Sequence, residues 1–130
     1  MMPTPGTRAD GHALPGRRLR RVTEYIQQNL DKDLTLAELA HVIHMSPYHF
    51  ARLFKGSTGV PPHRFVVRQR IARALGVLAT SELSIAEISR LVGFRTPSHF
   101  TTVFRQVLGI TPGAYRTAAS HEARLARGGG

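Results

Sequence analysis

The sequence predicts an all-α fold in which two similar helical units are joined by a longer connecting helix. Apolar residues recur with helical spacing through most of the chain, and no segment alternates as a β-strand would. The segment LTLAELAHVIHMSPYHFARLFKGSTGVPPHRF at 34–65 is repeated, with one inserted residue, as LSIAEISRLVGFRTPSHFTTVFRQVLGITPGAY at 83–115. The 130 residues suffice for one domain, or for two very small lobes that share a connector.

The chain begins and ends with segments of low apolar content. The start is rich in Pro and Gly, and the end carries three consecutive glycines, so we expect both to be loose. A first helix is predicted from about Arg17 to Leu30, because Leu19, Val22 and Ile26 share one helix face. The predicted parts are a disordered leader, a folded domain and a flexible tail, at residues 1–16, 17–119 and 120–130.

Each repeat opens with a short helix whose start carries a capping signal. Thr35 can cap the first of these helices, Glu38 can reach back to the cap, and Leu34 can pack on Leu39. The second copy repeats the signal with Ser84 and Glu87. The two glutamates could also be a catalytic carboxylate pair, but their shared capping position favours the structural role.

A second, longer helix follows each short helix after a tight turn. Its predicted start is Ser-Pro at 46–47 and Thr-Pro at 96–97, where the hydroxyl can cap and the proline suits the first helical position. Gly59 and Gly109 are predicted to end these helices.

The connecting helix is predicted from residue 62 to about residue 80, and a last short helix begins near Thr111. The residues of the connector expected to face the lobes are Phe65, Ile71, Leu75 and Leu78. The connector also carries arginines that could contact a nucleic-acid backbone, although Arg70 and Arg73 could pair with Glu82 instead.

Two short helices joined by a tight turn form a helix-turn-helix, whose second helix can enter a DNA major groove. We expect these units at about residues 36–57 and 85–108. The predicted buried faces of the second helices are Phe50, Leu53 and Phe54 in the first copy, and Phe100, Val103, Phe104 and Val107 in the second. The predicted outward residues are Tyr48, Arg52 and Lys55, with Ala51 at the margin, and then Ser98, Thr101, Thr102 and Arg105. A polar outer face would also suit a plain helical bundle, but the repeat, the caps and the charge together favour DNA.

The chain is strongly basic. Lys and Arg number 18 against 8 Asp and Glu, which gives a formal charge of +10. This balance fits nucleic acid or an anionic membrane, and the arginine run RRLRR at 17–21 could serve either or be a solvated helix start. No apolar run approaches the roughly 18–20 residues of a membrane span, and no signal peptide is apparent, so we expect a cytoplasmic protein.

Chemistry-bearing motifs are missing from the sequence. It has no Cys, which excludes disulfides and thiolate ligands, and it has no phosphate-cradling Gly loop or nucleophile elbow. The histidines that could suggest a metal site are His41, His44, His49, His63 and His99. Because they have no carboxylate at ligand spacing, we expect no metal, no cofactor and no enzyme activity.

From about Val22 to Arg116 the chain resembles the DNA-binding domain of the AraC/XylS family of transcription regulators. The motifs that carry the resemblance are LTLAELA, MSPYHFARLFK and TG, then RIARAL in the connector, then SIAEIS, VGF, SHF, FR and GITPGAYR. The resemblance implies seven helices, two helix-turn-helix lobes and a rigid connector. It also implies recognition helices that enter successive major-groove segments on one face of double-stranded DNA.

The resemblance assigns roles to individual residues. Those in base-contacting places are Tyr48, Ala51, Arg52, Ser98, Thr101 and Thr102. Backbone contacts are expected from Ser46, Lys55, Arg68, Arg95, Thr96 and Arg105. Arg52 is the foremost candidate for a direct base reader, with both guanidinium arms on a guanine. Thr102 and His44 depart from the family, which often has a basic residue and a glycine at these places.

The expected function is therefore sequence-specific binding of double-stranded DNA by a transcription regulator, with two reading helices on one chain. RNA polymerase is a further candidate partner, and an effector or dimerisation domain could belong to a longer protein. The alternative is a protein-interaction module that docks on RNA polymerase or another regulator and binds DNA weakly. The weakly charged second reading face leaves that alternative open.

Overall fold

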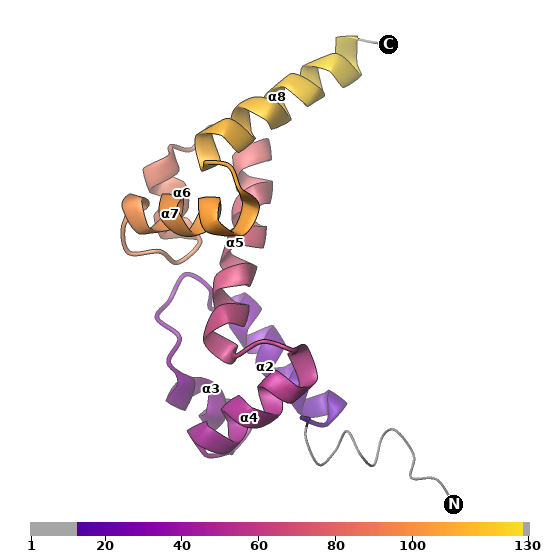
Figure 1. Cartoon of the computed structure of the whole chain (residues 1–130), viewed down its shortest axis with the longest axis vertical. Helices are drawn as coiled ribbons and strands as arrows, with labels where there is room; N and C mark the ends of the chain where they lie inside the picture. The colour runs from indigo at the N-terminus through magenta and orange to yellow at the C-terminus, as the bar shows by residue number, and fades with distance from the viewer. Residues whose placement is uncertain (1–12, 129–130) are drawn as a thin grey trace, which may run out of the picture. The chain divides into compact units, whose positions relative to one another are not determined.

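The computed structural model describes residues 13–128, and within that range it consists of helices and connecting loops without strands (Figure 1). The helices are α2 (Gly16–Gln28), α3 (Leu36–Val42), α4 (Pro47–Thr58), α5 (Pro62–Thr80), α6 (Ile85–Leu91), α7 (Pro97–Leu108) and α8 (Pro112–Gly128). The predicted all-α fold with seven helices, two lobes and a connecting helix is confirmed.

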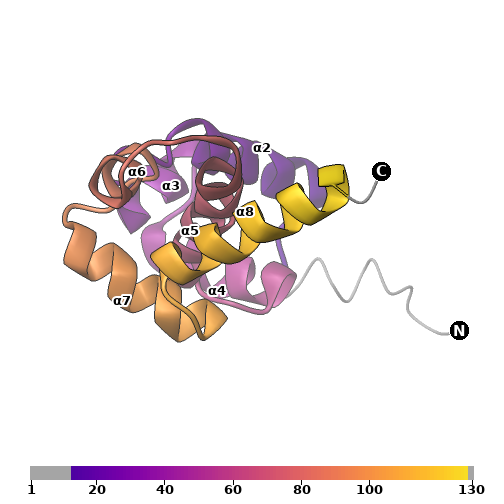
Figure 2. The same ribbon diagram turned by 90° about the horizontal axis from the view of Figure 1, so that it is seen from above.

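The chain divides into two compact units, Met1–Gln69 and Arg70–Gly130, which we call lobe 1 and lobe 2. In lobe 1, α3 packs against both α2 and α4, and in lobe 2, α7 packs against both α6 and α8 (Figure 2). The connecting helix α5 crosses the boundary, so its first half belongs to lobe 1 and its second half to lobe 2.

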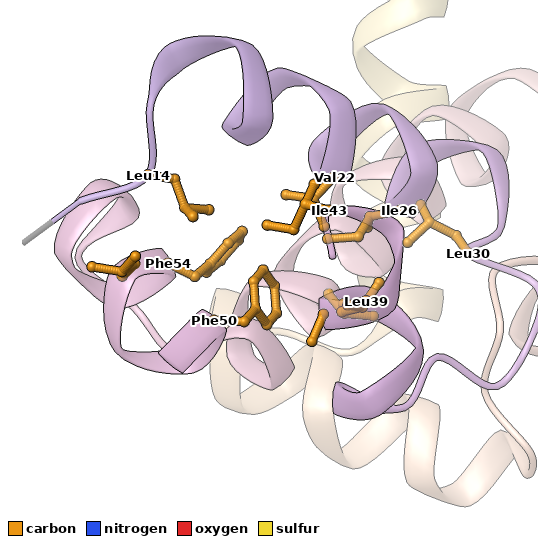
Figure 3. Close-up of a cluster of buried hydrophobic side chains, with 11 residues drawn as sticks. Leu14, Val22, Ile26, Leu30, Leu39, Ile43, Phe50 and Phe54 are labelled. Carbon is orange, nitrogen blue, oxygen red and sulfur yellow. The ribbon is translucent and has the colours of Figure 1, made fainter. Parts of the chain in front are cut away.

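The core of lobe 1 is made by the apolar stripes of its four helices (Figure 3). Val22 and Ile26 of α2 meet Phe50 and Phe54 of α4, and all four are fully buried. Phe54 also packs edge-to-face on Phe65 of α5, with ring centroids 5.1 Å apart. Burying each large side chain contributes roughly 1.5–3 kcal/mol, so these residues fix how α4 lies on the lobe.

The predicted leader is wrong for its last residues. Leu14 is buried with 6% exposure, and its amide donates a hydrogen bond to Ser57 Oγ at 2.7 Å. Leu14 carries no periodic signal in the sequence, because a single apolar residue before a Pro-Gly pair belongs to no helical pattern. The rest of the leader, residues 1–12, lies outside the described residues.

The core of lobe 2 repeats this design with α5, α6 and α7. Its buried side chains include Ile71 and Leu78 of α5, Ile88 of α6, and Phe100 and Phe104 of α7. The buried stripe predicted for the second reading helix is wrong at one residue, since Val107 is 45% exposed. Val107 lies in the last turn of α7, and Tyr115 of α8 packs one turn earlier, on the Phe104 ring at 6.1 Å.

The last helix is much longer than predicted. The sequence indicated a short helix and a flexible tail from residue 120, but α8 continues to Gly128. Residues 118–127 are rich in Ala, Arg, Glu and Leu, which are strong helix formers. The terminal glycines suggested disorder, yet the composition of the ten residues before them favours helix.

Candidate nucleic-acid interface

The second helix of the pair in lobe 1 is α4, and local hydrogen bonds fix both of its ends. Ser46 Oγ accepts from the His49 amide at 3.3 Å, and Pro47 occupies the first helical position. At the other end Gly59 has φ 83°, and its amide donates to the Lys55 carbonyl at 2.8 Å. The predicted start and end of α4 are confirmed.

The second helix of the pair in lobe 2, α7, has the same construction. Thr96 Oγ1 accepts from the His99 amide at 3.1 Å, and Gly109 ends α7 with φ 80° and a 2.8 Å bond from its amide to the Arg105 carbonyl. The two copies therefore encode the same 12-residue helix with different side chains.

The turns that precede these helices also correspond. Met45 N donates to the Ala40 carbonyl at 3.0 Å, and Phe94 N donates to the Ser89 carbonyl at 2.8 Å, so each turn folds back on its first helix. His44 adopts φ 57° and Gly93 φ 102°. His44, which stands where the family often has a glycine, thus takes a left-handed backbone as Gly93 does in lobe 2.

The first helices of the two pairs differ in their caps. Ser84 Oγ accepts from Glu87 N at 3.0 Å, and Glu87 Oε2 accepts from Ser84 N at 2.9 Å, so the predicted reciprocal cap is present in lobe 2. In lobe 1 only half of it forms. Thr35 Oγ1 accepts from the Glu38 amide at 3.1 Å, but the Glu38 carboxylate accepts from the Tyr25 hydroxyl instead of the cap backbone.

The Tyr25–Glu38 hydrogen bond joins α2 to α3. The bond itself, with smaller effects of desolvation and of the glutamate charge, raises the pKa of Tyr25 above its ordinary value. The sequence could not show this contact, because only the packing of α2 on α3 brings the two side chains together.

The outward face of α4 presents the residues predicted for lobe 1. Tyr48 is 75% exposed, and Arg52 and Lys55 are exposed on the same side of the helix, opposite Phe50. Ala51 is half-buried at the margin, as expected. We call this surface the α4 reading face.

The outward face of α7 is more neutral. Ser98, Thr102 and Arg105 are exposed, and Thr101 is half-buried. Thr96 caps the helix from the preceding turn, where Arg95 is also exposed. We call this surface the α7 reading face.

Arg68, the remaining residue expected to contact the DNA backbone, lies on another helix. Arg68 is exposed on α5, two residues after the buried Val66. The structure therefore groups Ser46 and Lys55 with the α4 reading face, whereas Arg68 stands on the connecting helix.

Arg116 has a structural role that the sequence did not reveal. Its Nε donates to the Leu78 carbonyl at 3.1 Å, and a terminal nitrogen donates to the Ser81 carbonyl at 3.3 Å. Arg116 thereby ties α8 to carbonyls at the end of α5, where the last backbone oxygens have no partner within the helix. The YR pair at 115–116 belongs to the family pattern, which was the one available signal.

Residues 13–128 contain no cluster of three His, Asp or Glu side chains placed to hold a metal ion. The same stretch has no helix of the length and apolarity needed to cross a membrane.

The fold and its two reading faces define a tandem helix-turn-helix protein, and comparisons with known proteins agree. A family model described as a helix-turn-helix domain matches residues 39–118. The chain is similar to regulatory protein PocR of Salmonella typhimurium, with 40% identity over 99 residues, which make up 76% of this chain and 33% of PocR. It belongs to the AraC/XylS family of transcription regulators, and it carries the DNA-binding helix-turn-helix domain of that family.

Solved structures give the same result. The DNA-binding domain of AdpA, crystallised with a target DNA, is 33% identical with a TM-score of 0.74, and the match covers 85% of this chain and 95% of that one. The C-terminal domain of AraT, a response regulator from Geobacillus stearothermophilus, is 31% identical with a TM-score of 0.76, and the match covers 82% and 88%. By contrast, the chain spans about a third of the length of the curated relatives it matches.

Proposed function

We propose that this chain binds double-stranded DNA sequence-specifically, with α4 and α7 as reading helices in successive major-groove segments. The observation that carries the proposal is the repeated construction of the two helices. Each is capped by a hydroxyl, ended by a left-handed glycine and polar on its outer face. Two equivalent reading helices suit a partner that itself repeats, as the major groove does.

The two reading faces would recognise bases by different means. Arg52 has the geometry to donate two hydrogen bonds to one guanine, while Tyr48 and Ala51 add apolar contacts. Ser98, Thr101 and Thr102 offer hydroxyls and methyl groups without charge. The α7 reading face would therefore discriminate less by charge-assisted hydrogen bonds and more by methyl contacts and DNA shape.

Phosphate contacts would supply most of the affinity. The Ser46 and Thr96 oxygens already accept a helix amide, but each hydroxyl keeps its own proton to donate to a phosphate. Positive charge would come from the remaining backbone candidates, Lys55, Arg68, Arg95 and Arg105. Each phosphate neutralised should add about 0.9 to the slope of log affinity against log salt concentration.

The wider role follows from the relatives. Since the matched segment makes up only about a third of each of these curated relatives, an effector-binding or dimerisation region would belong to a longer regulator. Such a regulator would act on chromosomal DNA in the cytoplasm, with RNA polymerase as a candidate partner and without chemistry of its own.

Selection of bound sites from a random DNA pool tests the proposal. We expect one enriched sequence with two recognition segments about one helical turn apart, and binding that weakens steeply with salt. Arg52→Ala should cost about 1–3 kcal/mol and relax preference at one or two base pairs, whereas Lys55→Ala should weaken selected and random DNA alike. A pool that stays random, with weak binding at every salt concentration, would favour the protein-interaction alternative.

A further inference from the structure

An apolar groove lies beside the α4 reading face in lobe 1. It has a volume of about 380 Å³ and is lined mainly by apolar side chains, among them Leu34, Leu36, Pro61 and Val66, together with Ala51 and His63. Leu36, at the first position of α3, is 41% exposed. We call this feature the Leu36 groove.

The Leu36 groove is continuous with the reading face through Ala51. At about 100° per residue, Ala51 lies between the buried Phe50 and the exposed Arg52 on the helix surface. Its half-buried side chain thus forms the edge at which the reading face ends and the groove begins. A DNA strand held against Tyr48 and Arg52 would pass next to this edge.

The charge around the groove suits a nucleic-acid strand. All the residues that line it are neutral or basic, so the groove itself presents no carboxylate to a phosphate. His63 and Arg64 follow Pro62 in the first turn of α5, and both side chains are exposed. The groove therefore has an apolar floor, and two hydrogen-bond donors lie at its rim near a helix N-terminus, where anions are stabilised.

The major-groove edge of DNA has one apolar feature, the 5-methyl group of thymine. We propose that the Leu36 groove receives a thymine methyl group at the edge of the bound sequence, with His63 and Arg64 donating to the adjoining phosphate. This inference rests on the proposed function, and it adds a specificity determinant that lies off the reading helix. It requires thymine, and not cytosine or uracil, at the matching position of the site.

Replacing thymine with deoxyuridine tests this directly, because it removes only the methyl group. In the selected site, each thymine is replaced in turn and the Kd measured with the unaltered protein. We expect about a fourfold loss at the position next to Ala51, the value for one buried methyl group. If no substitution in that half of the site raises the Kd, the proposal is wrong.

A protein variant identifies which side chain holds the methyl group, because Tyr48 could also contact a thymine. Leu36→Ala should weaken the thymine site and abolish the difference between thymine and uracil at one position, whereas Leu36→Met, of similar volume, should keep the difference. The matched control is Leu91→Ala, which removes an exposed leucine of lobe 2 and should leave the difference unchanged. Circular dichroism confirms that each variant is folded.

The outcomes separate the two proposals. If Leu36→Ala still binds the selected site specifically and still shows the full rise in Kd when thymine is replaced by deoxyuridine, the groove assignment is wrong and the proposed function stands. If no sequence is enriched from the random pool, both proposals fail together.

Discussion

The turn residue His44 offers a test of how the first helix pair is built. Among the residues described, it alone combines a side chain with a positive φ, at 57°, and the corresponding residue of lobe 2 is Gly93, with φ 102°. A left-handed conformation costs a residue with a Cβ about 1–2 kcal/mol. Glycine removes that cost, but its greater conformational freedom in the unfolded chain lowers the free energy of unfolding by about 0.5–1 kcal/mol. His44→Gly should therefore stabilise the protein by about 0.5–1 kcal/mol.

The reciprocal change should have the opposite sign. Gly93→Ala places a Cβ on a backbone with φ 102° and should destabilise by roughly 1–3 kcal/mol. Urea unfolding followed by circular dichroism measures both, and His41→Ala serves as a control for loss of the His41–His44 ring contact. A destabilised His44→Gly variant, or an unaffected Gly93→Ala variant, would refute the argument that backbone strain dominates these turns.

Three further predictions concern stability. Because the pKa of Tyr25 is raised in the folded state, its contact with Glu38 contributes stability that is present below about pH 10 and is lost as pH rises through the folded pKa. Tyr25→Phe should therefore flatten the pH dependence of the melting temperature on the alkaline side, above about pH 9. Gly76→Ala should stabilise by about 0.5–1 kcal/mol in urea unfolding, because the site is exposed and helical and an added Cβ meets no atom within 4 Å. Ser84→Ala, which breaks a reciprocal cap, should cost about 1 kcal/mol and more than Thr35→Ala; equal costs would contradict the difference between the two caps.

The elements that local sequence specifies were predicted well. The hydroxyl-proline starts and the glycine ends of α4 and α7 are signals contained within a few residues, and the structure has them as predicted. The same holds for the polar faces, because helical periodicity alone places Arg52 opposite Phe50.

The missed features depend on packing between segments distant in sequence. Leu14 is buried because Ser57 holds its backbone, and Glu38 leaves its cap because Tyr25 lies within reach. Neither contact has a local pattern. The Leu36 groove is likewise formed by three separate segments, around residues 34–39, 51 and 61–66, so the sequence predicted Ala51 as a contact but not what lies beside it.

The shared helix α5 has a consequence for how the protein unfolds. Val66 belongs to the core of lobe 1, and Ile71, Ala74 and Leu78 belong to the core of lobe 2, yet one uninterrupted helix carries all four. Starting a helix is its unfavourable step, and here a single start serves two cores. When one lobe unfolds, the core of the other lobe keeps its own half of α5 helical, and the unfolded lobe can extend that helix when it refolds. The amides in the middle of α5 should therefore be among the slowest in the protein to exchange with solvent.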